Sequence, residues 1–337
     1  MKTIISILPK KGIGRLIFFL SVSLMACACQ LNGSSNEKSK LQSVKILNWN
    51  LQTFFDGQFD GNEYNEYRSS KNGWCLEKYE VRLERLASVL KNLDADVVIM
   101  EEIEKEEQLK DITNRLCGTF DFKKLYSYQF FAKHGSDSIG CGVLSRFPLG
   151  KVLVHEIDNR LGKKQPPMRP IIQFTLYVKD SCLTVFVNHW KSKSGGAEKS
   201  ESWRLMQEKQ LANLMIKASR HNSPVLACGD FNKDIREFKK KSVDGKEYVI
   251  LCGDDNLKVY SPWISDGGII PDEGSYWYKN QWEKIDHFFS CGAILLCDFR
   301  AESKGEWAYE DGHPRRYQVW SGKGYSDHLP VSCTVCF

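Results

Sequence analysis

The segment VLACGDFN, residues 225–232, carries signals for both a strand and a polar site. Its first four residues are apolar or small and form a short run that is typical of a buried strand. Its last four, GDFN, have the composition of a turn and bring a carboxylate and an amide. The stretch therefore predicts a buried strand that ends in polar side chains at one edge of a sheet.

The same pattern recurs along the chain. Apolar runs rich in β-branched and aromatic residues are typical of strands, and polar side chains again stand in or beside them. Because these runs outnumber the helical segments, they predict two sheets. The runs are Val44–Asn50, Val97–Met100, Cys141–Phe147, Arg169–Val178, Leu183–Asn188, Ile285–Phe289 and Val331–Phe337.

Three segments have the features of amphipathic helices. Glu77–Leu93 carries leucines on one helical face, and Glu201–Ser219 repeats apolar residues near the helical period. Glu104–Leu116 indicates a further helix. Residues 42–337 are therefore predicted to form one mixed α/β domain, with two packed sheets and the helices on the outside.

Composition and charge exclude several classes of protein. Apolar residues make up 42% and charged residues 26%, which excludes disorder and collagen-like repeats for most of the chain. The 47 basic and 42 acidic residues give a charge of +5, but four of the basic residues lie in residues 1–26. Without that segment the counts are 43 and 42, so a wholly basic nucleic-acid coat is excluded.

The N-terminus has the pattern of an export signal. Residues 1–26 are predicted to be a signal peptide, because basic residues precede the apolar run Leu16–Ala26, which is too short to span a bilayer. The run ends in a lipobox-like LMAC, which makes Cys27 the expected lipidation site, with Cys29 as the second candidate. The polar residues 27–41 would form a flexible tether. We expect an exported protein of the bacterial cell envelope, membrane-anchored or periplasmic to extracellular; an ordinary cleaved signal peptide is the alternative.

Ten further cysteines follow, and their pairing stays open. Export would permit disulfides, for example Cys75–Cys117 or Cys291–Cys297. Several of the others lie in apolar runs, where a thiol packs as a small apolar side chain. The pair in Cys333–Cys336 has no second Cys or His pair with which to complete a zinc site.

Polar side chains at the ends of the predicted strands suit one kind of chemistry. Carboxylate and amide oxygens gathered at one sheet edge are ligands for a hard cation such as Mg²⁺. A neighbouring histidine can exchange a proton near neutral pH. Each residue also has a structural alternative: Asn50 can cap a turn, Asp230 can belong to a turn, and His189 and His328 can be buried structural histidines.

Six segments, taken in order, resemble the endonuclease/exonuclease/phosphatase superfamily, to which deoxyribonuclease I belongs. The resemblance covers about Val44 to Phe337 and implies a four-layer α/β sandwich, with two packed mixed sheets and helices outside. The segments are ILNWNLQTFFD (46–56), ADVVIMEEIE (95–104), VFVNHWKSK (185–193), LACGDFN (226–232), GSYWYKNQWEKIDHFFS (274–290) and YSDHLPV (325–331).

The resemblance also implies roles for particular residues. Asp230 matches the residue that orients or deprotonates the attacking water, and His328, held by Asp286, matches the catalytic histidine. Glu101 stands where the family usually has glutamine. The expected ion is Mg²⁺, with Mn²⁺ or Ca²⁺ as alternatives. The implied catalytic set is His189, Asp230, Asn232, Asp286 and His328, and the implied metal set is Asn50, Glu102 and Asp327.

Basic side chains near these segments bear on the substrate. Lys191, Lys193 and Arg316 are expected to bind a phosphate backbone. Trp190, Trp277 and Trp282 are expected to pack internally rather than stack on bases. The protein is therefore predicted to be a monomeric, Mg²⁺-dependent endonuclease that hydrolyses DNA or RNA outside the cytoplasm. A phospholipid or sphingomyelin phosphodiesterase, favoured by a membrane tether, and a catalytically silent surface-binding lipoprotein are the alternatives.

Overall fold

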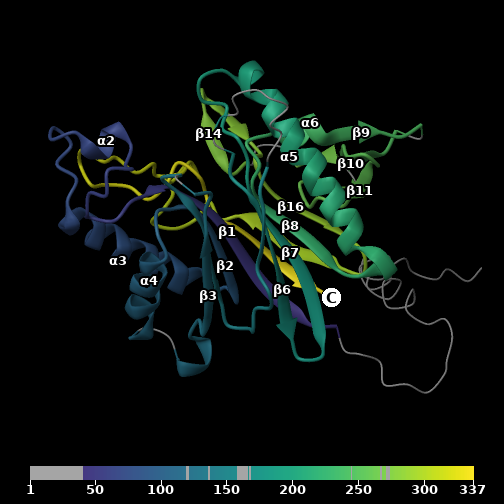
Figure 1. The fold of residues 1–337 in the computed structure, drawn as a ribbon, viewed down its shortest axis with the longest axis horizontal. Helices are drawn as coiled ribbons and strands as arrows, with labels where there is room; N and C mark the ends of the chain where they lie inside the picture. Colours follow the sequence, from purple (N-terminus) through teal and green to yellow (C-terminus); the bar gives the residue numbers. More distant parts are fainter. Residues whose placement is uncertain are drawn as a thin grey trace, which may run out of the picture. The chain divides into compact units, whose positions relative to one another are not determined.

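The predicted apolar runs pair into two mixed sheets in the computed structural model (Figure 1). The structure describes residues 41–118, 121–135, 137–157, 166, 168–243, 245–265, 268–270 and 274–337. The first sheet has the order β17 (Leu295–Ala301), β18 (Val331–Cys336), β1 (Ser43–Phe54), β2 (Val97–Ile103), β4 (Gly140–Ser145), β3 (Tyr128–Ala132). The second has the order β16 (Asp286–Cys291), β8 (Val225–Asp230), β7 (Ser181–His189), β6 (Ile171–Val178), β5 (Leu153–His155).

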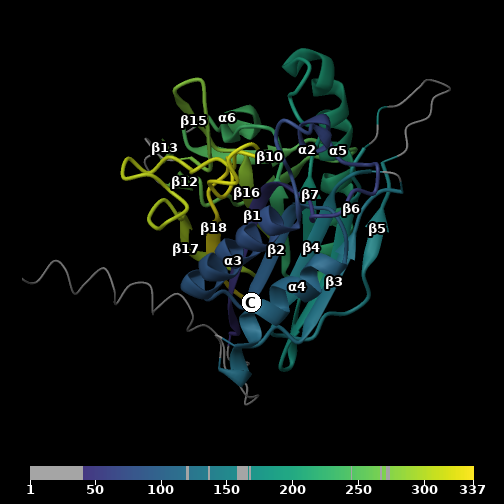
Figure 2. The same ribbon diagram turned by 90° about the vertical axis from the view of Figure 1, so that its left-hand side faces the viewer.

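Three helices cover the outer faces of the sheets (Figures 1 and 2). Leucines of α3 (Leu76–Leu93) and α4 (Glu107–Cys117) pack against the first sheet. Apolar residues of α5 (Ala197–Ala218) pack against the second sheet. A third core, made by apolar residues of both sheets, lies between them. The order of layers is therefore helix, sheet, sheet, helix.

Two helices begin at other residues than predicted. The helix α5 begins four residues earlier, after Gly196, because its polar first turn is held by Ser200, whose hydroxyl donates to Gly196 O at 3.0 Å. The helix α4 begins three residues later, because the side chain of Gln108 accepts hydrogen bonds from the backbone N–H groups of Glu104 and Lys105. The spacing of apolar residues in the sequence indicates neither of these hydrogen bonds.

Short elements connect the layers, and several of them were not predicted. They fall into two short helices, one three-stranded sheet and two hairpins. These elements are α2 (Asn65–Arg68), α6 (Ile235–Phe238), β9 (Lys239–Lys241), β10 (Glu247–Leu251), β11 (Leu257–Val259), β12 (Ile264–Ser265), β13 (Gly268–Ile269), β14 (Tyr276–Tyr278) and β15 (Gln281–Glu283), with 3-10 turns at Phe122–Lys124 and Arg220–Asn222.

Residues Leu41–Phe337 form one compact unit. The expected signal peptide, Cys27 and nearly all of the tether lie outside the described residues. In the part of the chain that the structure describes, no helix is long and apolar enough to cross a membrane. All ten cysteines of that part are unbridged, the two pairs considered above included.

A glycine is required at position 229, near the end of β8, because the backbones of β7 and β8 approach each other closely there. Its φ is +138°, and a Cβ there would lie 1.9 Å from the backbone oxygen of Asn188. We expect Gly229→Ala to lower the free energy of unfolding by at least about 3 kcal/mol, because backbone strain and a clash add together.

Urea denaturation of the Gly229→Ala variant tests this expectation. Gly195→Ala is the matched control, since its φ of +81° is also positive but no described atom would lie within 4 Å of the added Cβ. If Gly229→Ala lowers the free energy of unfolding no more than Gly195→Ala does, the close approach of the strands does not explain the glycine.

Candidate active site

The strand register of the second sheet places three of the predicted site residues side by side. His189 on β7 pairs with Asp230 on β8, and Asp230 pairs with Asp286 on β16. All three side chains are almost fully buried. Because each ends or begins its strand, the row lies at one edge of the sheet, as the sequence predicts.

The first sheet brings Asn50 and Glu102 to the same edge. Asn50 Nδ2 donates to Asp230 Oδ2 at 3.0 Å, which joins the ends of β1 and β8. The pairing of β1 with β2 is irregular here, and Gln52, Thr53 and Glu102 all have positive φ. This bulge turns the Glu102 carboxylate toward Asn50 and lets Thr53 N donate to it at 2.5 Å.

Asp230 lies at the centre of the cluster. Three donors reach its carboxylate: Asn50 Nδ2 at 3.0 Å, Asn232 N at 2.8 Å and Asn232 Nδ2 at 3.0 Å. Burial nevertheless raises the pKa of Asp230 to about 7, and the charge of Asp286 adds to the rise, whereas His328 opposes it. A carboxyl group with this pKa can accept a proton near neutral pH.

His328 and Asp286 form a buried pair beside Asp230. His328 Nδ1 lies 2.9 Å from Asp286 Oδ2, and its Nε2 lies 4.0 Å from Asp230 Oδ2. Burial alone would lower the pKa of His328, but the charge of Asp286, joined by those of Asp230 and Asp327, raises it well above the usual value. The Asp286 contact also fixes the ring so that Nε2 faces the site.

His189 differs from His328 in its charge state. Its Nε2 lies 3.6 Å from Glu102 Oε1 and 3.8 Å from Asp230 Oδ2. Burial lowers its pKa well below the usual value, and the charges of Arg169 and His328 act in the same direction. The site therefore combines one neutral histidine with one protonated histidine at neutral pH.

The oxygen-rich donor set fits a hard divalent cation. The Glu102 carboxylate has one oxygen held by Thr53 N, and its other oxygen faces Asn50 and His189. Asn50 Oδ1 already accepts from Gln52 N at 2.9 Å, so its amide nitrogen is the atom that faces the acidic side chains. Glu102 would thus be the principal ligand, and the assignment of Asn50 as a ligand stays a prediction.

Asp327 completes the predicted metal set. It lies in the turn before β18, next to His328, and this turn is fixed to β1 because Ser326 Oγ donates to Asn50 O at 2.6 Å. The Asp327 carboxylate lies 3.9 Å from Arg316 Nη2. Asp327 would be a further ligand of the ion, and Arg316, exposed beside it, is available to meet a phosphate.

Glu101, which departs from the family pattern, is buried in the interior and interacts with the charges of Asp286 and Asp230. It is fully buried and accepts a hydrogen bond from Asn48 Nδ2 at 3.4 Å, and its Oε1 has no partner among the described residues. Burial, with the charges of Asp286 and Asp230, raises its pKa well above the usual value. A protonated Glu101 has nearly the shape of glutamine, so it adds no charge at the site.

The predicted basic and aromatic residues lie around the cluster in different settings. Lys193 Nζ lies 3.3 Å from Glu237 and 3.5 Å from Glu283, whereas burial and Arg169 lower the pKa of Lys191. Trp277 and Trp282 pack against each other and against His313, which agrees with the expectation of internal packing.

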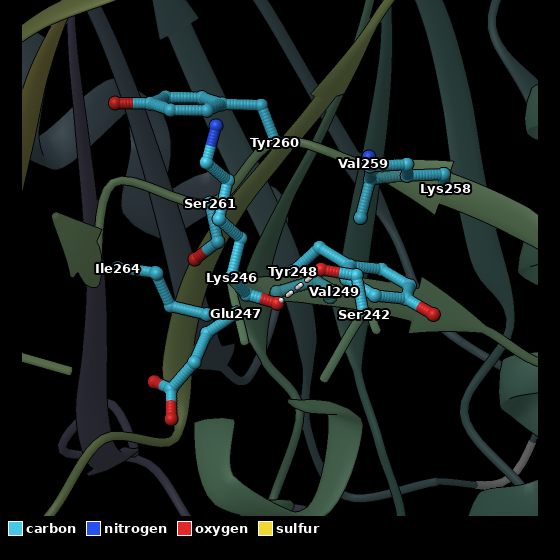
Figure 3. Close-up of a pocket in the computed structure, with 10 residues that line it drawn as sticks. All are labelled: Ser242, Lys246, Glu247, Tyr248, Val249, Lys258, Val259, Tyr260, Ser261 and Ile264. Atoms are coloured by element: carbon cyan, nitrogen blue, oxygen red, sulfur yellow. Dashed lines mark hydrogen bonds between the residues drawn. The ribbon is translucent and has the colours of Figure 1, made fainter. Parts of the chain in front are cut away.

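Two other features of the surface lie apart from this cluster. Within the described residues, Asp60, Glu63 and Glu104 place ligand atoms within 4.8 Å of one another, but none belongs to the predicted metal set. A cavity of about 750 Å³ lies over β10 and β11, lined by Tyr248 and Tyr260 among others (Figure 3), and no predicted site residue lines it. Neither feature contains a residue of the predicted catalytic set, which lies at the sheet edge described above.

Known proteins share this fold. The sequence model of the Endonuclease/Exonuclease/phosphatase family matches residues 45–336. A search of curated proteins gave no match. The chain is similar to truncated TDP2 of Caenorhabditis elegans, at 13% identity and a TM-score of 0.55 over 87% of this chain and 97% of that one.

Two further structures are similar to the chain. One is D. rerio TDP2 complexed with a single-strand DNA product, at 16% identity and a TM-score of 0.52 over 87% of this chain and 98% of that one. The other is a family protein of Bacteroides thetaiotaomicron, at 14% identity and a TM-score of 0.52 over 88% and 99%. At these identities the similarity concerns the fold, and it confirms the predicted deoxyribonuclease I-like sandwich.

Proposed function

Since the chain belongs to the endonuclease/exonuclease/phosphatase family, it is a metal-dependent phosphoester hydrolase, and we propose that its substrate is DNA or RNA and its ion Mg²⁺. The observation that carries the proposal is the buried pair of His328 and Asp286 next to Asp230, at the edge where both sheets meet. This arrangement places a proton acceptor, Asp230, and a proton donor, His328, side by side at the place where a phosphate would react.

Each side chain of the site has a separate role in the proposed reaction. Asp230 takes a proton from the attacking water while the water oxygen bonds to phosphorus, and Asn50 and Asn232 hold the carboxylate in place. His189, neutral and buried, donates a hydrogen bond to a phosphoryl oxygen. His328 gives a proton to the leaving oxygen as its bond to phosphorus breaks. A bound cation at Glu102 would neutralise charge on the phosphoryl group.

Charge around the site favours a nucleic acid over a lipid. Arg316 is exposed beside Asp327, and Lys191 follows His189 on the chain, so both can meet phosphates that flank the scissile one. The D. rerio TDP2 structure, which shares this fold, holds a single-strand DNA product, and this supports the choice of substrate. We also propose that the chain acts as a monomer.

The location of the protein is part of the proposal. We infer that residues 1–26 direct export, that Cys27 anchors the protein and that the domain lies outside the cytoplasm. The inference rests on the order of basic residues, apolar run and LMAC in the leader. Mass spectrometry of the mature N-terminus tests this inference. A diacylated Cys27 is expected, and a mature chain that retains residues 1–26 would contradict it.

The pH dependence of kcat/KM follows from the raised pKa values of Asp230 and His328. Asp230 must be ionised to act as base, so the rate should rise with pH through about 7 when Mg²⁺ is limiting. Added Mg²⁺ should move this rise to lower pH, since a nearby cation favours the carboxylate. His328 must keep its proton, so the rate should fall only at a pH well above the usual histidine pKa. A rate that rises steadily as the pH falls below 6 would contradict these roles.

Incubation of the purified chain with plasmid DNA, RNA and sphingomyelin tests the proposal directly. Each substrate is offered with Mg²⁺ and with a chelator. Cleavage of DNA or RNA that stops with the chelator is expected. Cleavage of sphingomyelin alone would establish the lipid phosphodiesterase instead, and no cleavage of any substrate would establish a silent binding protein.

A further inference from the structure

The hairpin of β14 and β15 is fixed directly to the strands that carry the acid–base pair. Ser275, at its base, is fully buried; its hydroxyl accepts from Asp286 N at 3.2 Å and its carbonyl accepts from Leu329 N at 2.7 Å. Tyr276 also forms a β-bridge with His328. The hairpin therefore has a set position over the site.

One face of this hairpin is a stack of aromatic rings that begins at His328. The Tyr276 ring lies 4.7 Å from the His328 ring, centroid to centroid, at 36°. The Tyr278 ring lies 6.0 Å from the Tyr276 ring and almost parallel to it, at 19°. Residues two apart in a strand share a face, so Tyr276 and Tyr278 lie on the site face and Trp277 packs on the other.

The outer end of the stack is exposed, and a flexible lysine side chain reaches over it. The side chain of Tyr278 is 45% exposed, although it belongs to an ordered stack. Lys279 Nζ lies 5.2 Å from the centre of its ring, and Arg316 is exposed near Asp327. An exposed aromatic face with cations beside it suits a flat ring that carries phosphates, because bases stack on aromatic side chains and cations meet the backbone.

We propose that Tyr278, supported by Tyr276, is a stacking subsite for the nucleobase next to the scissile phosphate, and that the substrate is therefore single-stranded or frayed nucleic acid. The inference rests on the proposed function and narrows its substrate class. A base inside a duplex is already stacked on its neighbours, so only an unstacked base can reach Tyr278 without a further energetic cost.

Aromatic rings also bind quaternary ammonium groups such as choline, which a sphingomyelin-cleaving relative would need. The cationic side chain of Lys279 at the Tyr278 ring opposes this alternative, because it would repel a second positive charge. The same lysine favours an anionic nucleotide.

The test compares steady-state kinetics of the unmodified chain and Tyr278→Ala on one single-stranded oligonucleotide, in intact form and with an abasic residue beside the cleaved bond. On the intact strand the variant should lose roughly 5- to 100-fold in kcat/KM, mostly through a higher KM. On the abasic strand the two proteins should be nearly equal, since no base is left to stack. Tyr278→Phe, which keeps the aromatic ring, should lose much less of kcat/KM than Tyr278→Ala does.

Tyr177→Ala is the matched control, since Tyr177 is 47% exposed but lies at the far end of β6. Equal losses for Tyr278→Ala on the intact and abasic strands would overturn the stacking subsite while leaving the nuclease function standing. Failure of the unmodified chain to cleave any nucleic acid would overturn both, and faster cleavage of blunt duplex than of single strand would overturn the single-strand preference.

Discussion

His328→Ala is expected to lower kcat on nucleic acid by about 10²- to 10⁴-fold, the range that a positioned acid or base contributes. The Asp286 carboxylate holds the imidazole of His328, whose Nε2 is directed toward Asp230. Alanine would remove the proton donor and leave Asp286 buried without its partner. Single-turnover cleavage of an oligonucleotide at saturating Mg²⁺ measures the loss.

His155→Ala is the control for this variant, because His155 lies on β5 and contacts Gln173 rather than the site. Circular dichroism of both variants separates loss of chemistry from loss of fold. Retention of Mg²⁺-dependent cleavage by a folded His328→Ala protein would refute the role of His328.

Asp230→Asn is expected to lower kcat by a similar factor, about 10²- to 10⁴-fold, because an amide cannot accept the proton of water. The substitution keeps the size of the side chain but presents an NH₂ group to the Asn50 and Asn232 donors. The residual rate should no longer rise through about pH 7, since the group whose pKa sets that rise is absent.

Pre-steady-state rates between pH 5 and pH 9 measure both effects of Asp230→Asn. Asp254→Asn is the matched control, because Asp254 is an exposed partner of Lys209 on another surface. An Asp230→Asn protein with an unchanged pH profile would show that another group is the base.

Much of the fold and of the site was predictable from the sequence for one physical reason. Buried strands need apolar side chains, so runs such as 225–228 and 97–100 stand out, and polar residues at their ends must share a sheet edge. The register that brings His189, Asp230 and Asp286 into one row follows from where those strands end. The six-segment resemblance is confirmed by the family match over residues 45–336.

Other features depend on local contacts that leave no periodic pattern in the sequence. The bulge that turns Glu102 into the site and leaves Glu101 in the interior arises from three residues with positive φ, none of them glycine. Tyr276 and Tyr278 lie in a three-residue strand that is too short to show alternation.

Anomalous diffraction from crystals of the domain soaked in Mn²⁺ shows whether Glu102, beside the catalytic row of the second sheet, holds a divalent ion. We expect an anomalous peak about 2 Å from the Glu102 carboxylate oxygen that faces Asn50. A peak confined to Asp60, Glu63 and Glu104, with none at Glu102, would contradict the account.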